Sequence, residues 1–190
     1  MLREDLLAKL GHVPTEKGNG KVILLHGTSS AGKTTLSKLI QEYCYSGGLG
    51  NYMYWSQDDF VEKYPSQVNE NLEELAEELP RIVYAFNSTI PEIAKQGINM
   101  IVDHVFTEEM WAKDFFIKMK GIDIISVGVT CSLEKTIERE KFRGDRPVGL
   151  AAYQYNRVHQ GLHYDLTVDT TTEDPERNVE KILEYIKTKK

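Results

Sequence analysis

The sequence has few cysteines, a deficit of positive charge and no long apolar run. Two cysteines, Cys44 and Cys131, occur among 190 residues, too few for a disulfide framework and without a CxxC pair for zinc. The 23 Lys+Arg against 29 Asp+Glu give a net charge of −6, whereas a general nucleic-acid binder needs a basic face. No apolar run reaches the length of a membrane span. We therefore expect a reduced, cytoplasmic protein with neither nucleic-acid nor membrane partners.

Short apolar segments alternate with helical patterns along most of the chain. The segments typical of strands are 22–25, 52–55, 98–102, 122–129 and 166–168. The helical patterns are 33–43, 81–96, 111–119, 133–142 and a last one that starts at Pro175. This alternation predicts parallel βαβ units, hence an α/β three-layer fold with a parallel sheet flanked by helices. Residues 1–20 are expected to form a short helix and a linker, and residues 21–190 one domain.

A glycine-rich motif follows the first predicted strand and opens a helix. It reads Gly27, Thr28, Ser29, Ser30, Ala31, Gly32, Lys33 and Thr34, which fits G-x-x-x-x-G-K-[ST] without a mismatch. Backbone N–H groups of such a loop converge on phosphate oxygens, and the helix dipole reinforces them. Lys33 is expected to reach the β- and γ-phosphates from an exposed turn, and the Thr34 hydroxyl to ligate Mg²⁺. With Thr35, these residues are the predicted nucleotide site.

A carboxylate at the end of the third strand belongs with this motif. The apolar run 98–102 ends in Asp103, at the sheet edge where parallel strands present ligand-binding residues. Mg²⁺ keeps several waters and takes few protein ligands. We expect Asp103 and Thr34 to hold the metal. The next residue, His104, is as compatible with a supporting role as with substrate contact, and His26 is expected to pack.

Two further acids follow the second predicted strand. Asp58 and Asp59 lie where a carboxylate can accept the proton of an attacking hydroxyl. The alternative is that they are solvated acids or that Asp59 caps the next helix. Position favours a function, and the sequence does not decide which of the two is the base.

Three arginines cluster late in the chain. Arg139, Arg143 and Arg146 lie within a segment, 139–149, that also contains Gly144. Arginines on a mobile lid stabilise charge on a transferring phosphoryl group. The alternative is a solvated, charged helix end, because acids alternate with the bases. The hinge-capable glycine favours the lid, with Arg139 on the nucleotide side.

The segment 58–80 is expected to shape the acceptor pocket. Its second half forms an amphipathic helical pattern with an acidic face, made by Glu70, Glu73, Glu74, Glu77 and Glu78. Charged faces usually meet water, and that is the simpler interpretation. The alternative is that the face overhangs the acceptor and favours cationic or neutral compounds over anionic ones.

The chain from about residue 21 onward resembles the chloramphenicol 3-O-phosphotransferase-like family of P-loop kinases. The resemblance rests on residues 29–33, Val102-Asp103 with Val105-Phe106, and Val127-Gly128-Val129 with Cys131. It continues through Arg143-Gly144-Asp145-Arg146, Gly149, Ala151, Gln154, His159, Gly161, Tyr164-Asp165 and residues 168–171. The N-terminal twenty residues have no counterpart, and the chain has Asp103-His104 where the antibiotic kinase has two acids.

The resemblance implies ATP-dependent phosphorylation of a hydroxyl on a small molecule, on a fold like that of nucleoside-monophosphate and shikimate kinases. It implies that Asp58 is the catalytic aspartate and that Arg143 and Arg146 are the lid arginines. It also implies that Asp169 and Thr170 lie in the loop near the adenine. The expected cofactors are ATP and Mg²⁺.

Two other functions share parts of this pattern. A toxin-like kinase acting on a nucleotide sugar has the same P-loop and base. A regulatory ATPase keeps the P-loop but more often positions a water with glutamine. The acids after the second strand and the arginines favour transfer to a bound acceptor. The sequence leaves the acceptor and the oligomeric state open.

Overall fold

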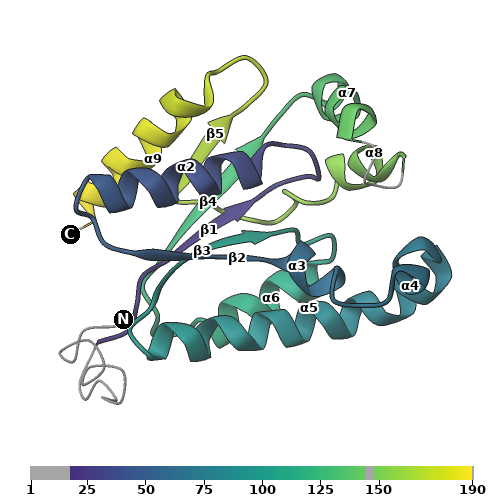
Figure 1. Ribbon diagram of the computed structural model, residues 1–190, viewed down its shortest axis with the longest axis horizontal. Coiled ribbons are helices and arrows are strands. Elements are labelled where there is room, and N and C mark those ends of the chain that lie inside the picture. Colours follow the sequence, from purple (N-terminus) through teal and green to yellow (C-terminus); the bar gives the residue numbers. More distant parts are fainter. Residues whose placement is uncertain (1–17, 144–147, 190) are drawn as a thin grey trace, which may run out of the picture.

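A computed structural model describes residues 18–143 and 148–189 as a parallel sheet with helices on both faces (Figure 1). Its strands are β1 (Val22–His26), β2 (Tyr52–Ser56), β3 (Asn99–His104), β4 (Ile124–Thr130) and β5 (Leu166–Asp169). They are ordered β2-β3-β1-β4-β5, and every neighbouring pair is parallel. The predicted α/β fold is therefore confirmed. The helix predicted near the N-terminus lies outside the described residues.

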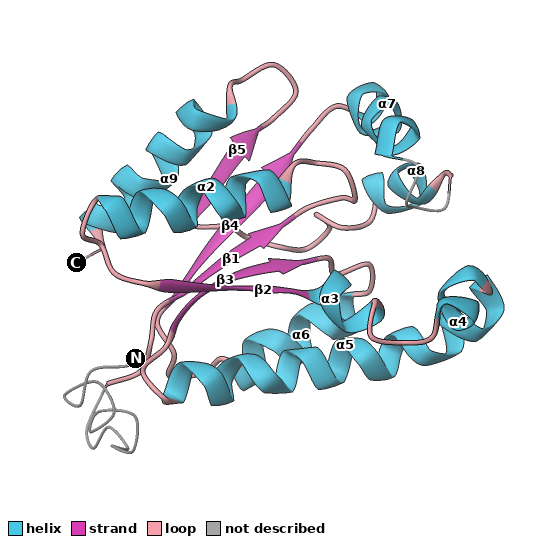
Figure 2. Ribbon diagram, in the orientation of Figure 1, coloured by secondary structure: helices cyan, strands magenta, loops and turns pink. Residues whose placement is uncertain are grey.

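The helices form two outer layers and one group at the end of the sheet. Their bounds are α2 (Lys33–Ser46), α3 (Gln57–Val61), α4 (Ser66–Glu70), α5 (Leu72–Lys95), α6 (Glu109–Lys118), α7 (Leu133–Arg143), α8 (Leu150–Tyr155) and α9 (Pro175–Thr188). Helices α2 and α9 cover one face of the sheet, and α5 and α6 cover the other (Figure 1). Figure 2 shows α3, α7 and α8 at the end toward which the strand arrows point. None of the described helices is long and apolar enough to cross a membrane.

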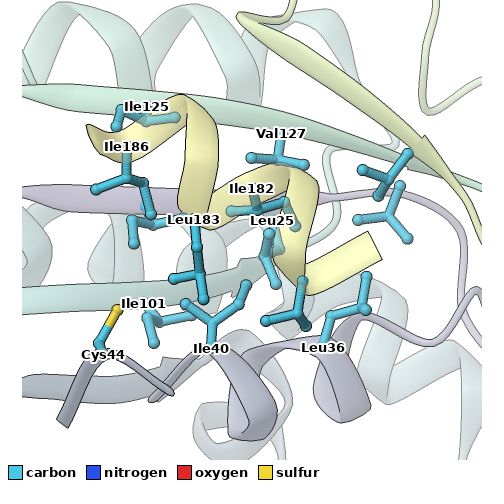
Figure 3. Packing of buried hydrophobic residues seen from close by; sticks show 14 of the residues in the cluster. Leu25, Leu36, Ile40, Cys44, Ile101, Ile125, Val127, Ile182, Leu183 and Ile186 are labelled. Carbon is cyan, nitrogen blue, oxygen red and sulfur yellow. The ribbon is translucent and has the colours of Figure 1, made fainter. Parts of the chain in front are cut away.

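The central strand β1 is apolar on both sides because it is buried on both sides. Successive side chains of a strand point to opposite faces. Ile23 and Leu25 accordingly join the core under α2 and α9, while Val22 and Leu24 join the core under α5 and α6. Figure 3 shows the first of these cores, where side chains of α2 and α9 meet those of the strands. This packing fixes the carboxyl end of β1, from which the glycine-rich motif departs.

Helix α5 corrects the sequence interpretation. The sequence shows one helical pattern in the second half of 58–80 and another at 81–96, with Pro80 between them. An internal proline lacks the N–H that bonds to the preceding turn. The structure makes them one helix, with Asn71 as its N-cap through bonds from the N–H groups of Glu73 and Glu74. Its second half is anchored on the sheet by buried side chains such as Phe86. The acidic residues at positions 73, 74, 77 and 78 therefore belong to the first turns of a helix that is rooted in the core, whereas Glu70, predicted on the same face, is the last residue of α4.

Candidate active site

The glycine-rich motif forms a tight loop between β1 and α2. Ser30 and Gly32 have left-handed backbone, with φ of 61° and 90°. A Cβ on Gly27 would lie 2.2 Å from the carbonyl oxygen of Val129, so this position accepts glycine alone. The hydroxyl of Ser30 is buried and has no hydrogen-bond partner within the described chain. Consecutive backbone N–H groups in such a loop make an anion-binding concavity, and Ser30 lines the cavity described below.

Lys33 is buried, which corrects the expectation of an exposed turn. The residue is 6% exposed, because its side chain folds back into the loop and donates from Nζ to the carbonyl of Thr28 at 2.9 Å. The same Nζ lies 3.7 Å from Oδ1 of Asp103. The loop therefore holds a buried cation that faces a buried carboxylate.

The structure brings the two predicted metal ligands together. The Thr34 hydroxyl donates to Oδ2 of Asp103 at 2.9 Å, and the hydroxyl of Tyr54 reaches the same oxygen at 3.4 Å. Burial raises the pKa of Asp103, whereas the charge of Lys33 and these two hydrogen bonds oppose the rise. Asp103 also feels the negative charge of Asp58, which raises its pKa further. A divalent cation at this position would relieve both effects.

Three contacts of α3 position Asp58. The Ser56 hydroxyl caps the helix by accepting from the backbone N–H of Asp58, so Ser56 takes the capping role considered for Asp59. The Gln57 side chain accepts from the N–H of Val105 at 3.2 Å, which ties α3 to the exit of β3. Phe60 packs edge-on against Phe86 of α5. Asp58 lines the cavity described below, whereas Asp59 is exposed and does not.

Arg139 is fixed beside the glycine-rich loop. Its guanidinium donates to the carbonyl of Thr170 at 2.8 Å and to the carbonyl of Ser30 at 3.5 Å. The hydroxyl of Thr170 in turn donates to the carbonyl of Ala31 at 2.7 Å. The loop after β5 is thus bound to the glycine-rich loop on the predicted nucleotide side. Asp169 does not line the cavity; its carboxylate accepts from the N–H of Thr171 in a turn.

Glu140 of α7 links the two helices on either side of the predicted lid. Arg143, the last residue of α7, is exposed and lines the cavity, while Gly144 and Arg146 lie outside the described residues. The carboxylate of Glu140 is buried and accepts from the N–H groups of Gly149 and Ala151, at 2.8 and 2.7 Å. These bonds satisfy N–H groups at the start of α8, which would otherwise have no partner. Helices α7 and α8 are therefore joined across the segment that carries the lid arginines.

One large cavity connects these groups. Its volume is about 2260 Å³, more than the few hundred to a thousand Å³ of ordinary ligand pockets. Lys33, Thr34, Asp103, Asp58, Arg139 and Arg143 all line it. The glutamates at positions 73, 74, 77 and 78 do not; α5 turns Leu72, Leu75, Ala76, Leu79 and Pro80 toward the cavity instead. The acidic face of α5 therefore meets water, as the simpler interpretation had it.

Sequence reasoning missed the role of two glutamines. The backbone N–H of Ser29 donates to Oε1 of the buried Gln154 at 2.7 Å, which links α8 directly to the glycine-rich loop. Gln57 holds the exit of β3 in the same way. Gln154 is one of the residues on which the family resemblance rests, so the sequence contained an indication of its importance. Nothing in the sequence indicated a role for Gln57, because its partner is 48 residues away along the chain.

A chain of aromatic and imidazole groups begins at the buried His26, the last residue of β1, and includes the half-buried Tyr164 and His159. Nε2 of His26 accepts from the N–H of Phe106 at 2.8 Å. A neutral imidazole then carries its proton on Nδ1, which lies 2.8 Å from the hydroxyl of Tyr164. That hydroxyl lies 2.9 Å from Nδ1 of His159. Burial lowers the pKa of His26 and of His159, and the charge of Lys33 lowers both further. His26 is thus a packing residue, as expected.

His104 also faces away from the cavity. It lies in the core, where its Nε2 is 2.7 Å from Oδ1 of Asn87 and its Nδ1 accepts from the N–H of Val105. Burial lowers its pKa to about 3. His104 therefore supports the exit of β3 from behind.

A parallel sheet that feeds a phosphate-binding loop, with a lysine, a hydroxyl and a carboxylate converging there, defines a P-loop phosphotransferase. The chain belongs to the chloramphenicol phosphotransferase-like family, whose model matches residues 20–187. It is similar to the protein of Mycobacterium tuberculosis (strain ATCC 25618 / H37Rv) named "Putative O-phosphotransferase Rv2636", at 30% identity over 171 residues. That match covers 80% of this chain and 76% of the relative.

Solved structures with low sequence identity share the fold. The Mycobacterium tuberculosis APS kinase CysC in complex with AMPPNP and APS superposes with a TM-score of 0.68 at 13% identity, covering 90% of this chain and 99% of that one. The shikimate kinase of Acinetobacter baumannii in complex with shikimate gives 0.65 at 16% identity, covering 89% and 94%. A gluconokinase from Sinorhizobium meliloti 1021 gives 0.62 at 15% identity, covering 91% and 94%. All three are kinases of the same architecture.

Proposed function

We propose that this protein transfers the γ-phosphoryl group of ATP to a hydroxyl group of a small molecule. The observation that carries the proposal is the shared cavity, in which the glycine-rich loop and Asp58 face the same space. A protein that only binds a nucleotide needs the glycine-rich loop, but it does not need additional space in the cavity for an acceptor. The name of the Mycobacterium tuberculosis relative and the nucleotide analogue and acceptors in the titles of the kinase structures support the same conclusion.

The residues of the loop are suited to hold the phosphates. The N–H groups of Ser29 and Ala31 already bond to Gln154 and Thr28, so the other N–H groups of the loop are the ones suited to donate to phosphate oxygens, and Lys33 offsets the phosphate charge. Arg139 and Thr170 hold the loop in place from the nucleotide side. Asp169, placed in a turn outside the cavity, is not assigned a contact.

The oxygen donors of Thr34 and Asp103 fit Mg²⁺. They are hard ligands 2.9 Å apart beside the phosphate loop. No group of three or more His, Cys, Asp or Glu within the described residues could hold a metal by itself. This pattern fits an ion that takes few protein ligands and arrives with the nucleotide. When bound, Mg²⁺ neutralises charge that develops on the transferring phosphate.

Asp58 is suited to accept the proton of the attacking hydroxyl. Its helix is pinned to the exit of β3, so the carboxylate keeps its place relative to the loop. Arg143 lines the opposite part of the cavity and is suited to stabilise charge on the transferring group. Arg146, predicted for the same role, remains a proposal from the sequence. Closure of the predicted lid, the segment 139–149, would exclude water and so suppress hydrolysis of ATP.

The test is ATP consumption by the full chain with and without a panel of hydroxylated antibiotics, nucleosides, nucleotide sugars and simple sugars. Mass detection of a phosphorylated product that depends on both ATP and the acceptor is the expected result. Hydrolysis of ATP at an equal rate without any acceptor would instead indicate a regulatory ATPase. A product formed from nucleotide sugars alone would select that alternative kinase. The variant Lys33→Met supplies the background rate.

A further inference from the structure

The half of the cavity away from the glycine-rich loop has an apolar wall. Residues Leu72, Leu75, Ala76 and Leu79 lie at helical spacing on the first turns of α5 and line this half. Val61 of α3 and Trp111 of α6 complete the wall. Leu72 is 60% exposed, although it is a large aliphatic side chain on a helix with polar positions available on its other faces. An exposed apolar surface inside a cleft marks a binding site for an apolar body.

The basic residues of the cavity all lie on its nucleotide side. There the described lining residues include the bases Lys33, Lys135, Arg139, Lys141 and Arg143 and the acids Glu134, Glu138 and Glu173. The lining residues of the segment 57–111 include no lysine, arginine or histidine. That segment contributes two acids, Glu62 and Glu108, besides Asp58 and Asp103. Neither Glu62 nor Glu108 forms a hydrogen bond or ion pair with its side chain in the part of the chain that the structure describes, and both are exposed.

From this arrangement we infer that the acceptor is an alcohol with an apolar, ring-sized body that is neutral or carries an amine, and that Glu62 and Glu108 set the preference for positive charge. The inference rests on the proposed function, since it names the acceptor class of that site. The charged groups that a carboxylate or phosphate on the acceptor would face in this half of the cavity are all negative. An ammonium group would gain from them, because local potential raises the concentration and affinity of the opposite charge.

Binding tests the inference independently of phosphoryl transfer. Three probes share a benzene ring and a benzylic alcohol and differ only in charge: para-(hydroxymethyl)benzylamine, para-benzenedimethanol and para-(hydroxymethyl)benzoate. Their Kd values for the full chain loaded with AMPPNP and Mg²⁺ are measured by ligand-observed NMR titration. We expect the amine to bind tightest and the benzoate weakest, with the difference shrinking as salt screens the carboxylates. Glucose, a polar neutral alcohol, should bind more weakly than the neutral diol.

Two sets of variants separate charge from shape. Glu62→Gln and Glu108→Gln should each raise the Kd of the amine by about fivefold or less, as for exposed charge pairs. Neither variant should change the Kd of the diol. Glu73→Gln and Glu77→Gln are the matched controls, since these glutamates carry the same charge on the outer face of α5; they should change no Kd. Leu72→Asn should weaken all three aromatic probes alike. Because Leu72 is exposed, this variant is expected to fold, and its Tm checks that.

Each result decides one of the two proposals. Benzoate that binds as tightly as the amine, glucose that binds as tightly as the diol, or an absence of binding by all four compounds overturns the inference. So does an efficient acceptor in the screen that carries a carboxylate or phosphate. Binding in the expected order without a phosphorylated product from any alcohol instead contradicts the proposed function and leaves the assigned pocket chemistry standing.

Discussion

The hydroxyl of Thr34 donates to Oδ2 of Asp103 at 2.9 Å, although 69 positions separate the two residues along the chain. One belongs to the glycine-rich motif and the other ends an apolar strand, and parallel pairing of β1 with β3 brings them together. The pair places two oxygen donors beside the phosphate loop. The sequence predicted both residues as metal ligands, and that role stays a prediction.

The first prediction concerns this pair. Thr34→Val should raise the Kd for ATP in the presence of Mg²⁺ and leave the Kd for ATP in EDTA nearly unchanged, because the hydroxyl acts through the metal. Thr34→Ser keeps the hydroxyl and is the control. Isothermal titration with and without Mg²⁺ measures the difference. An equal loss of affinity in both conditions would show that the hydroxyl binds the nucleotide without the ion.

The second prediction concerns the proton acceptor. Asp58→Asn should lower kcat by about 10² to 10⁴, the usual contribution of a general base, and leave ATP affinity nearly unchanged. Asp59→Asn is the matched control, since Asp59 is adjacent and exposed but does not line the cavity. Steady-state kinetics with the acceptor from the screen provide the measurement. A large loss in Asp59→Asn with an active Asp58→Asn would reverse the assignment.

The third prediction concerns the buried ion pair of Lys33 and Asp103. Lys33→Met leaves the Asp103 carboxylate buried without its cation, which should destabilise the fold by about 3 kcal/mol at neutral pH. Without Lys33, the pKa of Asp103 in the folded state rises further above its unfolded value. Above the unfolded pKa, the folded state of Lys33→Met still holds a proton on Asp103 that the unfolded state has lost. The free energy of unfolding therefore decreases as pH rises through the folded pKa.

Thermal unfolding from pH 5 to 8 measures this effect. The Tm of Lys33→Met should fall relative to that of the unmodified protein as pH increases. Lys33→Met combined with Asp103→Asn should recover much of the loss at neutral pH, because no carboxylate remains to be buried. A double variant that is no more stable than Lys33→Met would assign the loss to packing of the lysine stem.

The fourth prediction concerns Glu140. Glu140→Ala removes the acceptor of two N–H groups, those of Gly149 and Ala151, and should destabilise the protein by about 1–3 kcal/mol. Glu138→Ala is the control on the same helix. Glu138 is exposed and pairs with Lys135, so its removal should leave Tm unchanged. Denaturant unfolding measures both, and equal effects would contradict a special role of the buried carboxylate.

The fifth prediction concerns acid stability. Burial lowers the pKa of His26 and His159 in the folded state below the usual value of about 6.5, and that of His104 to about 3. Since the unfolded state then binds more protons, stability is full above the unfolded pKa and falls as pH drops below about 6.5. For His104 alone the loss at pH 5 is about 2 kcal/mol, from 1.5 pH units at 1.36 kcal/mol each.

His159→Gln should make the decline between pH 7 and pH 5 shallower. The glutamine has no titrating group, yet its carbonyl can accept the Tyr164 proton that Nδ1 of neutral His159 accepts. His163→Gln is the control, because His163 is exposed and makes no hydrogen bond that involves this network. Urea unfolding at several pH values measures the slope. An unchanged slope in His159→Gln would show that the pKa of His159 is the same in the folded and unfolded states.

The sequence predicted features that depend on local pattern. Buried parallel strands read as continuous apolar runs, and the glycine-rich motif fixes its own conformation through residues such as Gly27. The continuity of α5 through Pro80 could not be predicted locally, because packing of its second half on the sheet outweighs the missing hydrogen bond. The burial of Lys33 and the contact of Gln154 with Ser29 were missed for the same reason: their partners are set by the three-dimensional arrangement.

The two hydrogen bonds of Glu140 have a consequence for how α7 and α8 can move. Separating the end of α7 from the start of α8 would leave a buried carboxylate without its two donors. A buried charged group that loses its hydrogen bonds carries a large desolvation penalty. The two helices are therefore expected to shift as one unit beside the cavity, and exposed residues on either helix can change without altering how the pair is joined.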